Sequence, residues 1–297
     1  MCQPFDELSS NQEEADTKVF LAAKLAQEIG CSNIGIFTVD SDVAILACFY
    51  AMKLQSRLVV NIGSGCNVRI LDVCNTEWSL DVLNSLPSLH AISGCDAVSA
   101  FNGIGKAKWL STVVKKEEFL CALDNLGESL EVSENLFANI EHLVCHLYGM
   151  PNEVDIDNAR YKKFCKSKTP EPHQLPPTKD ELLQHVKRAN YQSYIWKRAF
   201  LVNPDVPSPT GHGWSENENH LEIVWMENQP APESLLELVV CDCRRAKCAD
   251  NCQCRILSME CTDVCKCAGN CENIVYDSDS SESDLDSGDN EEEDEVF

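Results

Sequence analysis

Apolar residues near the start of the chain recur every three or four positions, which is the period of an α-helix. Ser10 stands three residues before Glu13, the spacing of a capping box, so we expect a helix to begin there and to end at Gly30. The apolar face of this predicted helix consists of Ala15, Val19, Ala22, Ala26 and Ile29.

Three short segments after this helix are rich in β-branched residues and are bounded by turn-forming residues, which predicts strands. They are NIGIF (33–37), RLVVNIG (57–63) and NVRILDV (67–73). Strands that alternate with helices of about a dozen residues indicate an α/β fold with a mainly parallel sheet. The pattern from residue 80 to about 149 predicts a mostly helical continuation.

The second half of the chain has a different composition. SKTPEPHQLPP is typical of a linker, a helix is predicted to begin at Thr178 with Glu181, and the Pro-rich NPDVPSPTGHGW is assigned no regular structure. The last 22 residues are acidic and are predicted to be disordered. The predicted domains are a core (1–150), a helical and Pro-rich connector (151–235), a cysteine-rich module (236–275) and an acidic tail (276–297).

The net charge of −24 argues against nucleic-acid binding until its distribution is considered. The tail alone holds eleven acids and no base, whereas thirteen of the 24 bases lie in KAKWLSTVVKK, RYKKFCKSK and KRANYQSYIWKR. A local cationic surface is therefore compatible with an acidic protein, although such runs also occur as solvated helix faces. The tail suits chromatin or protein partners.

The sequence contains neither a secretory signal nor an apolar run long enough to cross a bilayer. We therefore expect a nuclear or cytoplasmic protein, with no membrane partner and with reduced cysteines outside the cysteine-rich segment.

Two aspartates, Asp40 and Asp42, follow the first predicted strand in TVDSDVAILA. Functional groups of parallel sheets gather at the carboxyl ends of strands, and alternating side chains leave an extended segment on the same side. Two like charges there favour a hard divalent cation as compensation. The alternative is an acidic turn that caps the next helix.

Two further segments add candidate residues. QEEADTK places Glu13, Glu14 and Asp16 in the first helical turn, where acids also complement the helix dipole. SGCDAVSAFNGIGKAKWL places Asp96 seven residues before Gly103, and its GIGK turn suits a phosphate at a helix start, although an ordinary interhelical turn has the same pattern. His90, between them, is interpreted as a structural histidine.

Taken in order, EEAD, TxDxD and GCD followed by GIGKAK resemble the core of the flap endonuclease or XPG-type 5′ nucleases, within the PIN-like nucleases. The resemblance covers about residues 10–115 and implies a three-layer PIN-like core that binds two Mg²⁺ or Mn²⁺ ions and hydrolyses phosphodiesters. It implies metal ligation by Glu14, Asp16, Asp40, Asp42 and Asp96, with Glu13 as a substitute. It implies nucleic-acid contacts at Gly103, Gly105, Lys106 and Lys108.

Members of that family begin with a strand that carries another metal-binding aspartate and continue into a helical arch. Neither has a counterpart before Ser10, so the chain is expected to correspond to the second half of such a nuclease.

We therefore keep two functional hypotheses. One is a structure-selective nuclease, acting on DNA rather than RNA, that is inactive if incomplete; the other is a non-catalytic DNA- or chromatin-binding zinc protein with a degenerate nuclease scaffold. In a third interpretation, zinc only stabilises a protein-interaction module.

Nine of the 18 cysteines crowd into 31 positions with the spacing CxCx₄Cx₃CxCx₆Cx₃CxCx₃C, which predicts a zinc site. Three tetrahedral ions need about twelve ligand positions, which nine thiolates supply if six are terminal and three bridge two metals. Two separate four-cysteine sites with one spare cysteine are the competing count, and a disulfide knot is least favoured. The predicted ligands are Cys241, Cys243, Cys248, Cys252, Cys254, Cys261, Cys265, Cys267 and Cys271.

The cysteine spacing resembles the CXC domain of tesmin/TSO1-type proteins, in which a cluster of three zinc ions replaces a hydrophobic core. Several such domains bind DNA, which makes DNA binding by this module an expectation. PSPTGHGW, the downstream WM and the terminal CXC segment also resemble proteins of mobile-element origin.

Overall fold

The N-terminal sheet is built around one parallel crossover. Strand β1 (Asn33–Thr38), helix α2 (Ser41–Ala51) and strand β2 (Arg57–Ile62) form this unit, and β3 (Arg69–Asp72) pairs antiparallel with β2. The sheet order is β1-β2-β3, so one pairing is parallel and one is antiparallel. The three predicted strands are confirmed, and the fold is mixed α/β.

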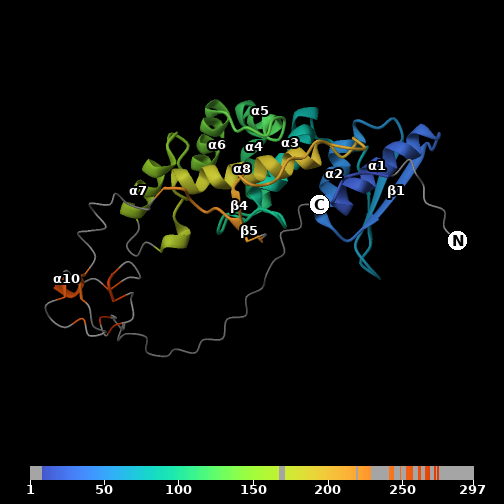
Figure 1. Ribbon diagram of the computed structural model, residues 1–297. Helices are drawn as coiled ribbons and strands as arrows, with labels where there is room; N and C mark the ends of the chain where they lie inside the picture. The colour runs from blue at the N-terminus through green and yellow to red at the C-terminus, as the bar shows by residue number, and fades with distance from the viewer. Residues whose placement is uncertain are drawn as a thin grey trace. The chain divides into compact units, whose positions relative to one another are not determined.

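The computed structural model describes residues 9–166, 171–218 and 220–228. In the cysteine-rich segment it describes residues 241–243, 248, 252–256, 260–261, 265–267, 271 and 273. The chain divides into two units, one made mainly of residues 1–226 and the other of 227–295. The predicted acidic tail lies outside the described residues. Figure 1 shows the described elements.

The sheet has a buried face and an exposed face. Ile36 and Val60 are neighbours in the register and are buried under α2, whereas Phe37 and Ile70 on the opposite face are 81% and 71% exposed. Helix α1 (Ala15–Glu28) contacts both β1 and α2, and its Phe20 stacks on Tyr50 of α2. The described elements therefore form two layers here, whereas the resemblance implies three.

Helix α1 begins four residues later than the sequence predicts. Its N-cap is Glu14, which makes no side-chain capping bond, and the Ser10 hydroxyl accepts a hydrogen bond from the Gln12 N–H at 3.0 Å. The Gln12 side-chain amide donates to the carbonyls of Ala199 and Leu201. The predicted capping box would make this segment helical, but its side chains bond to distant parts of the chain instead. The predicted N-cap at Ser10 is therefore wrong.

The region from residue 80 onward is helical, as predicted, and α6 and α8 form its centre. Helix α8 packs along α3 and α6, and α6 also contacts α4, α5 and α7 (Figure 1). The elements are α3 (Leu80–Ser93), α4 (Lys106–Val113), α5 (Glu117–Asn125), α6 (Glu134–Leu147), α7 (Ile156–Lys166), the 3₁₀ turn η2 (Pro172–Gln174) and α8 (Lys179–Trp196).

The C-terminal end of α8 joins the helical part to the sheet part. The Tyr50 hydroxyl donates to the Trp196 carbonyl at 2.7 Å and accepts from the Ala199 N–H at 2.9 Å. At the other end, Thr178 and Glu181 form the predicted capping box. Helix α8 is therefore fixed at both ends, which holds the two halves of the larger unit together.

A short antiparallel hairpin, β4 (Trp214–Asn217) and β5 (His220–Ile223), follows the Pro-rich segment and was not predicted. Its residues are mostly exposed and polar, so they give no alternating apolar pattern. A single turn, α10 (Gln253–Ile256), lies in the cysteine-rich segment. None of the described helices has the length and apolar character needed to cross a bilayer.

The buried His185 on α8 makes the stability of this core dependent on pH. Its Nε2–H donates to the Ile92 carbonyl of α3 at 2.9 Å, and burial lowers the pKa of His185 from 6.5 to about 4. The unfolded chain therefore takes up a proton below pH 6.5 that the folded chain does not.

We expect the free energy of unfolding to be insensitive to His185 above pH 6.5 and to fall between pH 6.5 and 4, by up to about 1.4 kcal/mol per pH unit. His185→Gln should remove this contribution to the slope. Urea unfolding at several pH values measures it, with His173→Gln, an exposed histidine, as the matched control. Equal slopes for the wild type and His185→Gln would contradict the assignment.

Candidate metal and nucleic-acid sites

The start of α2 holds two of the predicted aspartates. Asp40 is the N-cap, and its Oδ1 accepts a hydrogen bond from the Asp42 N–H at 2.8 Å, while its own N–H donates to Thr38 Oγ1 at 2.9 Å. The capping alternative is thus present in the structure. One Asp40 oxygen makes the cap, and a carboxylate has acceptor capacity beyond that bond.

Asp42 is buried and pairs with a histidine 48 residues away. His90 Nε2 lies 2.7 Å from Asp42 Oδ1, and Lys106 Nζ lies 3.4 Å from the same His90 nitrogen. Burial alone would raise the pKa of Asp42, but the His90 hydrogen bond and the charges of His90 and Lys106 outweigh it and lower the pKa. His90 is therefore a structural partner, as the sequence suggested, and Asp42 is held ionised.

Asp16, in the first turn of α1, is repelled by the charges of the other predicted aspartates. Burial raises the pKa of Asp16 above its ordinary value, and repulsion from three carboxylates raises it further. Those carboxylates belong to Asp40, Asp42 and Asp96. Two segments that are distant from α1 in the sequence thus place negative charge around the Asp16 side chain.

Glu14 is hydrogen-bonded to two side chains of α8. Its two oxygens accept hydrogen bonds from Gln192 Nε2 at 2.9 Å and from Trp196 Nε1 at 3.1 Å. Burial raises the pKa of Glu14, the two hydrogen bonds lower it, and repulsion from Asp16 and Asp42 raises it again, with a net upward shift. Glu14 therefore lies beside the aspartates but already has two partners.

Asp96 and the glycine turn follow α3. Asp96 is exposed in a tight turn closed by the Cys95 and Val98 backbones. The GIGK turn is anchored by buried Ile104, and Gly105 is the N-cap of α4 with no capping side chain. Gly103 has a φ of +67°, a conformation that disfavours other residues.

The oxygen atoms of these carboxylates form no group, within the described part of the chain, in which all ligand atoms lie within 4.8 Å of one another. Among the described residues, the groups whose ligand atoms all lie within 4.8 Å of one another consist of cysteines. The aspartates thus share an electrostatic neighbourhood without converging on one point, and their metal ligation stays a prediction.

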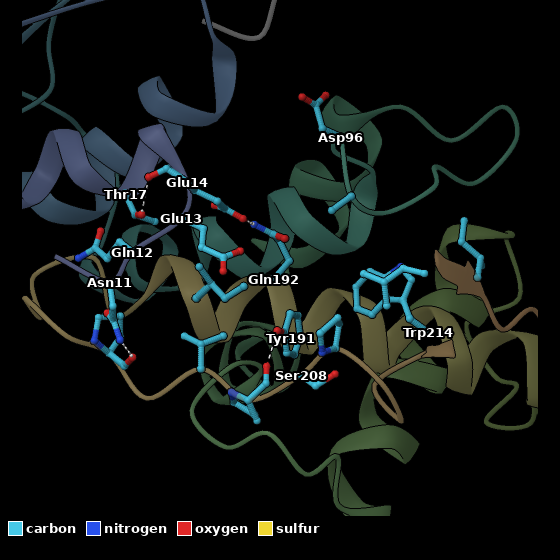
Figure 2. Close-up of a pocket in the computed structure, with 18 residues that line it drawn as sticks. Asn11, Gln12, Glu13, Glu14, Thr17, Asp96, Tyr191, Gln192, Ser208 and Trp214 are labelled. Carbon is cyan, nitrogen blue, oxygen red and sulfur yellow. Dashed lines mark hydrogen bonds between the residues drawn. The ribbon is translucent and has the colours of Figure 1, made fainter. Parts of the chain in front are cut away.

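A cavity of about 860 Å³ lies beside this neighbourhood and was not predicted. Glu13, Glu14 and Asp96 line it on one side, and Tyr191 and Trp214 line it on the other. Figure 2 shows the Glu14–Gln192 hydrogen bond at its wall and the Asp96 carboxylate pointing away from the two aromatic rings. No local sequence pattern indicates this cavity, because its aromatic wall comes from α8 and the unpredicted hairpin.

The nine cysteines of the C-terminal unit lie together and form no disulfide. Neighbouring Sγ atoms lie 3.8 Å apart for Cys241 and Cys248, 3.9 Å for Cys241 and Cys261, and 3.6 Å for Cys254 and Cys265. A tetrahedral zinc with bonds of about 2.3 Å separates its sulfurs by about 3.8 Å. The spacing therefore matches thiolates around zinc, and the cluster could bind it.

Three four-sulfur groups can be recognised, and they overlap. Cys241 belongs to all three, whereas Cys248 and Cys261 each belong to two. The groups are Cys241, Cys243, Cys248 and Cys252; Cys241, Cys254, Cys261 and Cys265; and Cys241, Cys248, Cys261 and Cys267.

Cys271, the ninth cysteine, makes side-chain contacts with the thiols of Cys248, Cys261 and Cys267. Cys271 therefore lies beside the third group. Burial, followed by the neighbouring thiols, raises the pKa of Cys248 far above its ordinary value, so a thiolate there requires a cation. The crowding of sulfurs thus favours a bound metal over free thiols.

The charges near the cluster are partly paired. Lys266 forms an ion pair with Asp242, and Arg255 Nη1 lies 3.4 Å from the Cys248 carbonyl oxygen. Three further bases of this segment, Arg244, Arg245 and Lys247, lie outside the described residues. DNA contacts by this module therefore stay a prediction.

No protein-family model, curated protein or solved structure matches the chain. Its class is therefore given by its own geometry: a mixed α/β fold with many helices, followed by a cysteine cluster that could hold zinc.

His90→Leu tests the pairing that holds Asp42. It should leave a buried carboxylate short of a partner and lower the free energy of unfolding by about 1–3 kcal/mol without added divalent cation. The double variant His90→Leu/Asp42→Leu should lose less than the sum of the two single variants, because both polar groups are removed. Urea unfolding gives the cycle, and strict additivity would show that the two side chains do not interact.

Proposed function

We propose that the protein is a nucleic-acid phosphodiesterase of the PIN-like type, in which Asp16, Asp40, Asp42 and Asp96 hold Mg²⁺ or Mn²⁺. The observation that carries the proposal is the repulsion that Asp16 experiences from the other three carboxylates. A group of acids raised in energy by mutual repulsion is relieved by a divalent cation, and oxygen-only ligands suit these two metals.

Bound metal ions would supply the chemistry of the reaction, activating a water and stabilising the leaving oxygen of the phosphodiester. The chain supplies positioning. The capping bond orients Asp40, and His90 orients Asp42. The uncapped start of α4 at Gly105 offers backbone N–H groups to a phosphate, and the exposed Lys108 adds positive charge nearby.

A second candidate is a non-catalytic nucleic-acid-binding zinc protein with the same scaffold. Two contacts favour it: Asp42 already pairs with His90, and Glu14 already accepts from Gln192 and Trp196. Both candidates share a preference for DNA, which rests on the sequence resemblance. They also share a nuclear or cytoplasmic location and partners for the acidic tail, which rest on the composition of the sequence.

For the cysteine module we propose three zinc ions with three bridging thiolates, Cys241, Cys248 and Cys261. These are the cysteines shared between four-sulfur groups, and the other six then serve as terminal ligands in pairs. The pairs are Cys243 with Cys252, Cys254 with Cys265, and Cys267 with Cys271.

Cleavage of single-stranded and flap DNA in Mg²⁺ or Mn²⁺ tests the first candidate. Asp16→Asn/Asp96→Asn should lower the rate by at least about 100-fold, because the variant removes two of the proposed ligands while leaving the His90–Asp42 pair intact. Asp81→Asn, an exposed acid in the first turn of α3, is the matched control and should cleave normally.

The outcomes separate the candidates. Wild-type chain that binds DNA and cleaves nothing in either metal would overturn the first candidate and leave the second. Cleavage that survives in Asp16→Asn/Asp96→Asn would assign the activity to another site.

Metal content of the purified chain tests the cysteine assignment. We expect about three zinc ions per chain by elemental analysis, and about one fewer in Cys271→Ser because a terminal ligand of one ion is lost. Cys165→Ser, an exposed cysteine on α7, should keep the full content. Two ions per chain, unchanged in Cys271→Ser, would instead favour two separate four-cysteine sites with Cys271 as the spare.

A further inference from the structure

The cavity beside α8 combines acidic and apolar walls, and the proposed metal chemistry does not use it. The described residues that line it include three acids and no base, and its volume of about 860 Å³ lies in the range of known ligand sites. Asp96 is one of the proposed metal ligands, and its carboxylate points away from the aromatic wall (Figure 2). Glu13 and Glu14 are therefore the acids that remain for an occupant of the cavity.

Glu13 supplies a carboxylate without a partner. It is exposed, and among the described residues none forms a hydrogen bond or an ion pair with it. Glu14 accepts hydrogen bonds from Gln192 and Trp196, and burial raises its pKa. A cation in the cavity would interact mainly with Glu13 and would also favour the ionised form of Glu14.

Gln12 adds a buried acceptor that lacks a donor. Only 6% of Gln12 is exposed, and it lines the same cavity. Its Nε2 donates to the carbonyls of Ala199 and Leu201, whereas its Oε1 accepts no hydrogen bond from a described residue. A buried acceptor without a donor is unfavourable, so a ligand that brings N–H groups into the cavity would stabilise this wall.

Two aromatic rings form the opposite wall. The ring centroids of Tyr191 and Trp214 lie 5.5 Å apart, and the ring planes meet at 67°. The Tyr191 hydroxyl donates to the Pro207 carbonyl at 2.7 Å, and His212 stacks on the Tyr191 ring. These contacts hold the wall in place before a ligand binds. A cation within about 6 Å of such a ring is attracted by its negative face.

Strand β5 adds an apolar surface and an open edge. Leu221 and Ile223 line the cavity, alternate along the strand and are 57% and 44% exposed. Ile223 lies directly opposite Trp214 in the hairpin register, so these side chains share one face. Within the described sheet β5 pairs only with β4, which leaves the outer edge of β5 available to a further strand. This combination suits an extended peptide.

We propose that the cavity binds a basic side chain, arginine or lysine, presented by an extended peptide of a partner protein. The cationic head lies between Glu13 and Trp214 and donates to Gln12, while neighbouring apolar side chains of the peptide pack on Leu221 and Ile223. Charge complementarity selects this occupant over a nucleic-acid strand, whose phosphates the lining acids repel.

The acidity of the chain, with a net charge of −24, explains the acids of the cavity by itself. It explains neither the aromatic wall nor the buried Gln12 oxygen without a donor. The inference goes beyond the proposed function, because a peptide site here needs no divalent cation.

Pentapeptide arrays with a fixed central residue and random flanking residues test the occupant. The fluorescently labelled, zinc-loaded full chain, without added Mg²⁺ or Mn²⁺, should bind arginine-centred or lysine-centred peptides at least about threefold more than citrulline-centred ones. Citrulline is the matched control, because it keeps the shape of arginine without the charge. Equal binding to all three centres would overturn the inference.

Variants assign the binding to the cavity. With the best arginine-centred peptide in solution, Glu13→Gln and Trp214→Leu should each weaken binding about threefold or more, because one removes the charge and the other the aromatic face. Trp214→Phe should restore most of the affinity. Glu28→Gln, an exposed acid at the other end of α1, and Phe37→Leu, an exposed ring on the sheet, are the matched controls and should have no effect.

Glu13→Lys gives a result that a purely structural role for this residue would not produce. It should abolish the preference for arginine over citrulline while the thermal midpoint of unfolding stays unchanged, since Glu13 is exposed. A Trp214 variant that fails to fold leaves the Glu13 variants as the test. A preference that persists in both Glu13 variants would overturn the inference.

The remaining outcomes separate this site from other occupants and from the proposed function. N-acetylarginine methylamide that binds as tightly as the best peptide would overturn the peptide occupant. An oligothymidylate that displaces the best peptide in wild type, and binds more tightly in Glu13→Lys, would assign the cavity to nucleic acid and overturn the inference. Peptide binding by a chain that cleaves no DNA would keep this site and remove the catalysis.

Discussion

Repulsion between carboxylates is the constraint on which the functional interpretation depends. Asp16 at the start of α1 is repelled by Asp40 and Asp42 at the start of α2 and by Asp96 in the turn after α3. A protein gains no stability from such an arrangement, because like charges in partly buried positions oppose folding. The fold tolerates it by pairing Asp42 with His90 and Lys106 and by bonding Glu14 to α8.

The same contacts divide the acids into two kinds. Asp42 and Glu14 have partners inside the protein, so they connect the acidic region to α3 and α8. The positions of Asp16 and Asp96 depend less on such hydrogen bonds, and Asp96 is exposed. A cation would therefore have its largest effect on the second kind, while the first kind fixes the surrounding helices. In the C-terminal unit the nine cysteines cluster together, and this cluster could hold a metal.

Local signals were sufficient for much of the fold. The three strands and the Thr178 capping box follow from residues close together in the sequence, and both appear where predicted. The predicted start of α1 was wrong because the Gln12 side chain donates hydrogen bonds to carbonyls near residue 200. A local sequence pattern contains no information about such distant contacts. The His90–Asp42 pair spans 48 residues for the same reason. The cysteines are different, since their spacing alone predicts a shared set of ligands and the structure brings them together.

The exposed face of the sheet has a practical consequence for handling the protein. Strand β1 is one of the two outer strands of the described sheet, and its Phe37 has most of its surface in water. Open strand edges flanked by apolar side chains are templates to which further chains add by backbone hydrogen bonding. Concentrated samples are thus prone to edge-to-edge association, and a charged residue at position 37 is a rational way to keep them dispersed.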